Sequence, residues 1–220
     1  MARFTAADWI LVAAALFMVG RSIVEPRPSI NIMGALEVSG PVSDDHWDRA
    51  VATGIRFGDP TSTDTIVEFI DFECPFCRLF VSRLDSLLAS EPFDKSVLVV
   101  FQHYPLTNHR FSVPAAIAAE CGDRQGQFEA IYRLLLAKQD SLGLKTWRAY
   151  ASDARVPNLD TFERCRQLPL DSFPRITAGQ GLGRDAGVTS TPTIWFRRVS
   201  HRGMQALDSI ANRILALQHR

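Results

Sequence analysis

The chain has 220 residues, enough for one ordinary domain plus an appendage, and 46% hydrophobic and 22% charged residues are typical of a globular protein. Its 24 basic and 24 acidic side chains cancel, which argues against nucleic acid as the main partner because binding phosphates needs surplus cations. A single long apolar run excludes a multi-span membrane protein. Four cysteines are the most informative residues that remain.

The apolar run, WILVAAALFMVG at residues 9–20, lies between Asp8 and Arg21. A helix of this length covers about 18 Å, less than the roughly 30 Å hydrocarbon core of a bilayer. A cleaved export signal is one interpretation, although no Ala-x-Ala site follows the run. An uncleaved membrane anchor over residues 1–24 is slightly favoured, and a buried core helix is the third alternative. Both export interpretations place the rest of the chain outside the cytoplasm, where disulfides persist.

Proline, glycine and scattered charges predict a linker over residues 25–50, followed by a folded domain over residues 51–220. Two apolar, β-rich stretches at residues 65–70 and 97–101 predict buried strands, and a helical stripe at residues 76–88 separates them. Strand, helix and strand at this spacing predict a βαβ unit with parallel pairing and a right-handed crossover.

Helical patterns then fill residues 107–186, where Asp160 is expected to cap a helix that carries Cys165. Strand character returns at residues 193–196, and a last amphipathic helix follows. The connection at residues 197–200 lacks an Asn-Gly turn, so the strand after it is expected to be short or irregular.

The sequence Cys74-Pro75-Phe76-Cys77 stands where the first predicted strand leads into the helix. Proline suits the first helical turn because its missing N–H would lack a partner there. Cys74 then lies at the helix N-terminus, where free amides and the dipole stabilise a thiolate, and Cys77 lies one turn further on. A thiolate that leaves easily beside a resolving thiol is what thiol–disulfide exchange requires. Half of a zinc site and two idle core cysteines are the weaker alternatives.

Glu68 lies inside the apolar strand six residues before Cys74, where burying a charge is costly unless it has a role. One interpretation is a carboxyl that accepts and returns the proton of Cys77, and this is favoured; the other is an outward-facing residue of an edge strand. Pro192 is expected at the first residue of the third strand. A cis Thr191–Pro192 bond would place its backbone against the cysteines, although trans is the default.

Three stretches together resemble the DsbA-like branch of the thioredoxin superfamily: VEFIDFECPFC, AAECGDRQGQFEAIYRLLLAKQ and GVTSTPTIWF. The resemblance covers about residues 55–218. It implies an α/β thioredoxin fold with an inserted helical domain, here preceded by an N-terminal hydrophobic helix. It also implies a periplasmic location in bacteria and protein dithiol substrates, and the exchange chemistry needs no organic cofactor or metal.

Matched position by position, the resemblance implies that Cys74 is the exposed nucleophile and Cys77 the resolving cysteine. It makes Glu68 the buried acid and Pro192 the cis-proline beside the disulfide, preceded by Thr191. The best-known members carry His where this chain has Phe76. Losing that cation should raise the pKa of Cys74 and make the disulfide less oxidising.

Cys121 and Cys165 both fall in the helical insertion. In an oxidising compartment an even cysteine count suggests a structural bridge, which would contribute about 4 kcal/mol through loop closure. The alternative is two separate buried thiols that behave as small apolar residues. His103 and His109 near the second strand suggest, as a minority interpretation, a copper or zinc site together with the CxxC.

The favoured function is an exported protein thiol–disulfide oxidoreductase that oxidises dithiols of secreted proteins through Cys74 and Cys77. A membrane or soluble redox partner would reoxidise the pair, and the N-terminal helix would tether the protein to the inner membrane on its periplasmic side. One rival is a reductase or isomerase with the same fold. The other is a copper- or zinc-binding module that uses the CxxC.

Overall fold

The computed structural model describes residues 39–89 and 97–218. The apolar run at residues 9–20, predicted to be an export signal, an anchor or a core helix, lies outside the described residues. Within the described ranges, no helix combines the length and the hydropathy needed to cross a bilayer.

The strands of the described chain form one mixed sheet in the order β1-β6-β5-β3-β4-β2. They are β1 (Ser39–Pro41), β2 (Ile55–Gly58), β3 (Thr65–Ile70), β4 (Leu98–His103), β5 (Thr193–Phe196) and β6 (Val199–Arg202). β3 and β4 pair in parallel, and the other neighbouring strands pair antiparallel. The predicted βαβ unit is therefore confirmed, with the second strand running two residues beyond its expected end.

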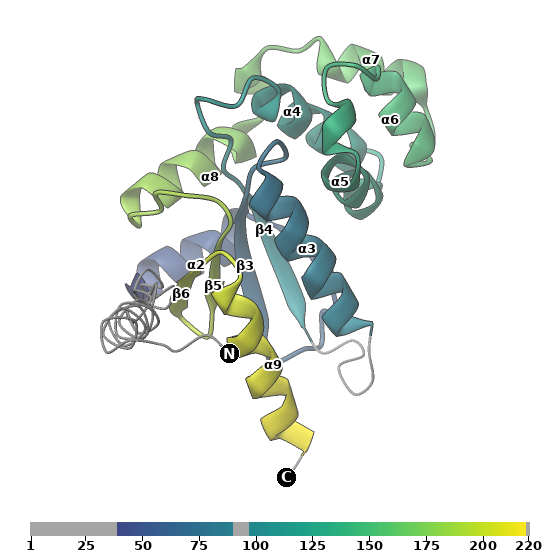
Figure 1. The fold of residues 1–220 in the computed structure, drawn as a ribbon. Coiled ribbons are helices and arrows are strands. Elements are labelled where there is room, and N and C mark those ends of the chain that lie inside the picture. Colours follow the sequence, from purple (N-terminus) through teal and green to yellow (C-terminus); the bar gives the residue numbers. More distant parts are fainter. Residues whose placement is uncertain (1–38, 90–96, 219–220) are drawn as a thin grey trace, which may run out of the picture. The chain divides into compact units, whose positions relative to one another are not determined.

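Helices cover both faces of this sheet and fill the segment between β4 and β5. They are α2 (Asp44–Thr53), α3 (Pro75–Leu88), α4 (Ser112–Asp123), α5 (Phe128–Ala137), α6 (Trp147–Asp153), α7 (Leu159–Arg166), α8 (Pro174–Asp185) and α9 (Gln205–Gln218), with short 3₁₀ turns η2 (Gln139–Ser141) and η3 (Leu170–Ser172). Figure 1 shows α4 to α7 gathered at one end of the sheet, beside the start of α3. This arrangement confirms the α/β thioredoxin fold with an inserted helical domain.

The alternation of side chains along β3 builds two cores. Ile66 and Ile70 face a large cluster with side chains from α3, α5 and α9. Val67 and Phe69 face a smaller cluster with side chains from α2 and α8. Because β3 is central and covered on both faces, it reads as a continuous apolar run rather than an alternating one.

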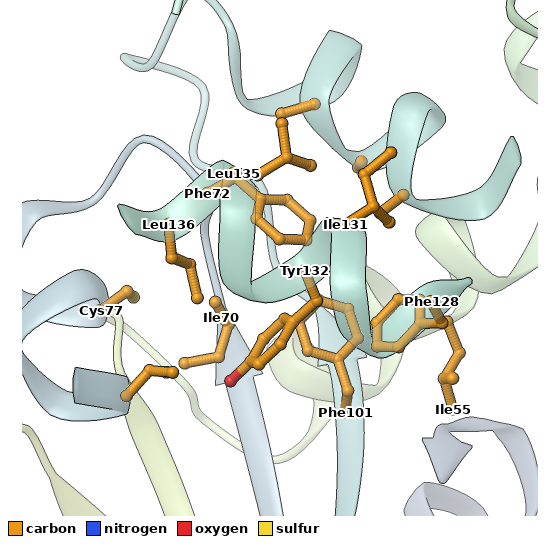
Figure 2. Close-up of a cluster of buried hydrophobic side chains, with 14 of the residues drawn as sticks. Ile55, Ile70, Phe72, Cys77, Phe101, Phe128, Ile131, Tyr132, Leu135 and Leu136 are labelled. Carbon is orange, nitrogen blue, oxygen red and sulfur yellow. The ribbon is translucent and has the colours of Figure 1, made fainter. Parts of the chain in front are cut away.

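Aromatic rings dominate the larger core where α5 meets the sheet. Figure 2 shows Tyr132 beside Phe101 and Phe128, with its hydroxyl on the side away from Phe128. The Tyr132 ring centroid lies 5.4 Å from that of Phe101 and 5.7 Å from that of Phe128. This packing ties the helical insertion to β4, because α5 belongs to the insertion and Phe101 to the sheet.

The segment expected to be a linker, residues 25–50, contains regular structure from Ser39 onward. β1 pairs with β6, and α2 packs on the sheet through the fully buried Ala50. Ser43 caps α2 by accepting a hydrogen bond from the His46 amide. The folded unit therefore includes residues before the expected start at 51.

Two local expectations are corrected. Asn158 rather than Asp160 caps α7, since the Asn158 side chain accepts from the Thr161 amide at 2.8 Å. β6 is short, as expected, with four residues, but it is not the edge of the sheet because β1 pairs outside it. The two-residue turn before it is made by Arg197 and Arg198, which both adopt positive φ, the geometry that closes tight hairpins.

Candidate active site

The CxxC sequence lies at the junction between β3 and α3. Cys74 is the N-cap of α3 and Pro75 follows within the first turn, as the sequence predicts. The Cys74 amide donates to the Asp71 carbonyl at 3.1 Å, and the Cys74 carbonyl accepts from the amides of Cys77 (3.0 Å) and Arg78 (3.3 Å). One turn of backbone thus carries Cys74 from the sheet into the helix and brings Cys77 onto the same side.

The two sulfurs have opposite acid–base properties. A hydrogen bond from the Cys77 thiol lowers the pKa of Cys74 to about 6; partial burial opposes this shift, and amides of the first helical turn add to it. Burial raises the pKa of the Cys77 thiol well above its ordinary value. The reduced pair at neutral pH is therefore a thiolate at Cys74 and a thiol at Cys77, the unlike pair that exchange chemistry uses.

The two cysteines are less exposed to solvent than the resemblance implies. Cys74 is only 5% exposed, whereas an exposed nucleophile was expected, and Cys77 is fully buried. The physical reason is that the segment before β5 packs over the Cys74 sulfur, which lies 3.3 Å from the Thr191 carbonyl. The small accessible surface of the pair therefore belongs to Cys74, while its neighbour Phe76 is 65% exposed.

Thr191 and Pro192 lie against Cys74 although they are far from it in sequence. The peptide bond between them is cis. When Cys74 carries its proton, its thiol donates to the Thr191 carbonyl, and a hydrogen bond from the Thr191 side chain helps to lower the pKa of Cys74. Among the described residues the buried Thr191 hydroxyl oxygen has no hydrogen-bond partner, so the hydroxyl is available to a thiolate at Cys74.

Glu68 is completely buried in the middle of the sheet. Its strand is central, with Phe101 on one side and Ile194 on the other, so the alternative of an outward-facing edge residue is wrong. Neither carboxyl oxygen has a hydrogen-bond partner within the described residues. Burial raises the pKa of Glu68 to about 8, and the nearby Tyr132 hydroxyl only partly offsets this rise. Glu68 therefore holds a proton at neutral pH on the sheet face that α3 covers.

Asp71 shapes the turn before Cys74, a role that the sequence analysis did not assign. Its buried carboxylate accepts from the Glu73 amide at 2.7 Å, which tightens the turn. It also contacts the Leu106 amide at 2.8 Å, His109 Nδ1 at 2.7 Å and the Ser112 hydroxyl. Asp71 thus joins the turn to the segment that leads into α4.

Gln139 is a second contributor that the sequence analysis missed. It lies in η2 of the helical insertion, and its side-chain amide donates to the carbonyls of Phe72 and Cys74. The sequence does offer a signal for Asp71, because it is an acid that directly follows an apolar strand, three positions before Cys74. Gln139 carries none, because its partners lie 65 and 67 positions away along the chain.

The two histidines considered for a metal site are engaged elsewhere. His103 is buried with Nε2 2.9 Å from Glu120, and His109 contacts Asp71. In the part of the chain that the structure describes, no three His, Cys, Asp or Glu side chains are grouped to hold a metal ion. The structure therefore does not bring His103 and the CxxC together as a ligand set.

Cys121 on α4 and Cys165 on α7 form a disulfide within the insertion, with their Cα atoms 5.8 Å apart. Cys74 and Cys77 are both free thiols. The four cysteines thus divide into one bridged pair remote in sequence and one reduced pair at the helix start.

Three solved structures share this fold. BdbD from Bacillus subtilis, in its oxidised form, superposes with a TM-score of 0.65 at 20% identity, covering 81% of this chain and 96% of that chain. The thiol-disulfide exchange protein alpha-DsbA2 from Wolbachia pipientis superposes with a TM-score of 0.62 at 19% identity, covering 79% of this chain and 92% of that chain. A thioredoxin-like oxidoreductase from Silicibacter pomeroyi superposes with a TM-score of 0.62 at 21% identity, covering 80% of this chain and 99% of that chain.

Curated relatives match a similar stretch but are much longer. The Na(+)/H(+) antiporter NhaA 3 of Salinispora tropica is 31% identical over 163 residues, which are 69% of this chain and 23% of the relative. The antiporter NhaA 1 of Mycobacterium sp. strain KMS is 32% identical over 150 residues, 66% of this chain and 24% of the relative. The chain therefore spans about a quarter of the length of these relatives.

The family model described as Thioredoxin matches residues 50–214, a range that contains both cysteine pairs and the Thr191–Pro192 bond. This match takes in β3, α3, β4, the helical insertion, β5 and β6. The chain therefore belongs to the thioredoxin family and has its DsbA-like fold, with a helical domain inserted between β4 and β5.

Proposed function

We propose that this protein is a thiol–disulfide oxidoreductase that oxidises dithiols of other proteins through Cys74 and Cys77. The observation that carries the proposal is the unlike pair of sulfurs at the start of α3. One has a lowered pKa and a little exposed surface, and the other is buried with a raised pKa. The family and the DsbA-like fold support this assignment.

The cycle starts from the Cys74–Cys77 disulfide. A substrate thiolate attacks the Cys74 sulfur, a substrate–Cys74 disulfide forms, and Cys77 leaves and takes up a proton. The second substrate thiolate then attacks the sulfur of the first, and Cys74 leaves as a thiolate. Two electrons pass to the protein and the substrate is released as a disulfide.

The burial pattern decides which sulfur is attacked, since a substrate reaches Cys74 and not Cys77. Glu68 is proposed to supply the proton that Cys77 takes up, because it is protonated at neutral pH and faces the core that contains Cys77. Thr191 and Pro192 are proposed to dock the substrate backbone beside Cys74.

The lowered pKa of Cys74 supports the oxidising direction of the proposal. A thiol with a pKa of about 6 is mostly ionised at neutral pH, which stabilises the reduced protein and favours the transfer of electrons to the disulfide. Phe76, which leaves no cation between the cysteines, limits this effect. A membrane or soluble redox partner is proposed to reoxidise the pair.

A location outside the cytoplasm, with the N-terminal apolar run as signal or tether, is part of the proposal. The Cys121–Cys165 disulfide supports it, because structural disulfides persist in oxidising compartments. A structure of similar fold is that of a periplasmic thioredoxin-like protein from Salmonella enterica, with a TM-score of 0.56 at 22% identity.

The experiment mixes the purified oxidised protein with a reduced dithiol peptide and follows disulfide formation. Wild type should oxidise the peptide, Cys74→Ser should not, and Cys77→Ser treated with an activated disulfide of the peptide should hold a stable mixed disulfide at Cys74. The matched control is the double variant Cys121→Ala/Cys165→Ala, which removes the other cysteine pair and should retain activity. Full activity of Cys74→Ser would contradict the proposal.

Equilibration with a glutathione buffer then settles the direction. A potential well above that of thioredoxin, about −270 mV, supports an oxidase. A potential at or below that value would instead assign the same site to a reductase.

A further inference from the structure

Gln139 reaches from the helical insertion into the turn that presents Cys74. It lies in η2, shortly after α5, and the residue is 9% exposed. Its neighbour Asp140 pairs with Arg78 on α3 at 2.9 Å, so η2 contacts the start of α3 at two points. The Asp140 pair is exposed and contributes little, whereas Gln139 is buried.

Gln139 directs both of its N–H groups at the same short turn. Nε2 lies 2.7 Å from the Phe72 carbonyl and 2.9 Å from the Cys74 carbonyl. A primary amide has two donors, and these two carbonyls use both of them. Since the Cys74 carbonyl also closes the first turn of α3, Gln139 bonds the backbone group that fixes where the helix begins.

We propose that Gln139 is a positioning residue that holds the turn from Phe72 to Cys74 in the geometry required for exchange and makes that geometry depend on the helical insertion. The inference rests on the proposed function, because it assigns Gln139 a role in the same reaction.

The physical consequence is electrostatic as well as geometric. The amide places the positive ends of two N–H dipoles beside the carbonyl oxygens of Cys74 itself and of Phe72, two residues before it. Without them, two buried carbonyls lose a donor, and the negative potential near Cys74 rises. A more negative surrounding disfavours the thiolate, so the reduced form becomes less stable and the disulfide less oxidising.

The test compares two substitutions of similar size. Gln139→Met keeps the volume and removes both donors, and Gln139→Glu keeps the shape and puts an acceptor where donors are needed. The matched control is Gln102→Met, because Gln102 is also buried and donates to the Ala50 carbonyl at 2.7 Å on the other face of the sheet. For each protein, the ultraviolet absorbance of the thiolate gives the pKa of Cys74, and glutathione equilibration gives the potential.

The pKa of Cys74 should rise from wild type to Gln139→Met and further to Gln139→Glu. The equilibrium constant for reduction by glutathione should fall about tenfold in Gln139→Met, the equivalent of roughly 30 mV. Gln102→Met should lose thermal stability with no change in either quantity. Gln139 variants that lose stability but titrate like wild type would overturn the inference, and a wild type inactive on every dithiol would instead overturn the proposed function.

A measurement on the unmutated protein remains decisive if the variants do not fold. The side-chain amide resonances of Gln139 should shift when Cys74 titrates and again when the Cys74–Cys77 disulfide forms. Resonances that follow neither event would show that Gln139 does not sense the redox turn.

Discussion

Two sulfurs three positions apart acquire different chemistry from their places at one helix start. Cys74 stands before the helix, where amides and the Cys77 thiol stabilise its charge. Cys77 stands inside the helix, fully buried, where a charge would be costly. Pro75 lies in the first turn, where its missing N–H costs no backbone hydrogen bond, so the helix can begin between the two cysteines. Glu68 adds a third titratable group, which burial keeps protonated near neutral pH.

Replacing Glu68 by Gln tests the buried carboxyl. Burial raises the pKa of Glu68 in the folded protein from its ordinary value of 4.5 to about 8, so the stability linked to this group is full below pH 4.5 and is lost as the pH rises through 8. Glu68→Gln should therefore gain stability over wild type as the pH rises, by up to about 5 kcal/mol above pH 8. Denaturant unfolding at several pH values measures the difference.

The same variant separates the structural effect of Glu68 from its catalytic role. If Glu68 supplies the proton to Cys77, Glu68→Gln should be more stable yet slower in the step that forms the substrate–Cys74 disulfide. Asp64→Asn changes another buried acid, directly before β3, and is the control for effects that are not specific to Glu68. Parallel stability curves for wild type and Glu68→Gln between pH 5 and 8 would contradict a buried, protonated carboxyl.

Elements built from local patterns were predictable, and those fixed by distant contacts were not. β3, α3 and β5 appear where apolar runs and helical spacing place them. α2 was missed because its apolar face is narrow and its partners on the sheet come from later in the chain. The cap of α7 was misplaced by two residues, since both Asn158 and Asp160 are good capping residues and only geometry chooses between them.

The hairpin between β5 and β6 shows how distant contacts override local preference. Arg197 and Arg198 have φ of 52° and 62°, which is unfavourable for residues with a Cβ. Arg198 is held by Asp44 of α2 and lies over the Trp47 ring, with its guanidinium carbon 5.5 Å from the centroid. A helix far away in sequence therefore stabilises a turn that the local residues disfavour.

Arg197→Asn should stabilise the protein by about 0.5–1 kcal/mol, because Asn adopts positive φ more readily at the first position of such a turn. The measurement is the midpoint of denaturant unfolding with an unchanged slope. Arg198→Asn is the matched control, since the same relief of φ is offset there by loss of the Asp44 and Trp47 contacts. An unfolding midpoint that falls in Arg197→Asn would show that the turn is not strained at this residue.

At the scale of the whole described unit, the helical insertion is joined to the sheet by buried polar side chains as well as by the aromatic core. Glu120 of α4 links His103 of β4 to Arg175 of α8. His103 Nε2 lies 2.9 Å from one oxygen of the Glu120 carboxylate, and Arg175 Nη2 lies 2.7 Å from the other. Gln139 makes the second polar connection. The sequence predicted the insertion and both cysteine pairs, but it contained no signal for these links because each joins residues that only the fold brings together.

Glu120→Gln tests whether the polar chain holds the insertion and the sheet together. The variant leaves the buried His103 and the partly exposed Arg175 without their shared carboxylate, although Arg175 keeps its pair with Asp123, and should lower the free energy of unfolding by about 1–2 kcal/mol at neutral pH. Although burial alone would raise it, His103 and Arg175 lower the pKa of Glu120, so this stability is present above pH 4.5 and is lost on further acidification. The deficit of the variant should therefore shrink in acid.

The control for this prediction is Asp123→Asn, which removes the more exposed of the two acids that contact Arg175 and should cost less. Amide hydrogen exchange distinguishes a loss of stability where the insertion meets the sheet from a loss of stability throughout the protein. In Glu120→Gln, protection should fall most for amides of β4, α4 and α8, the three elements that the chain of contacts joins, and least for β6. Uniform loss of protection across the described sheet would mean that Glu120 supports overall packing and does not specifically couple the insertion to the sheet.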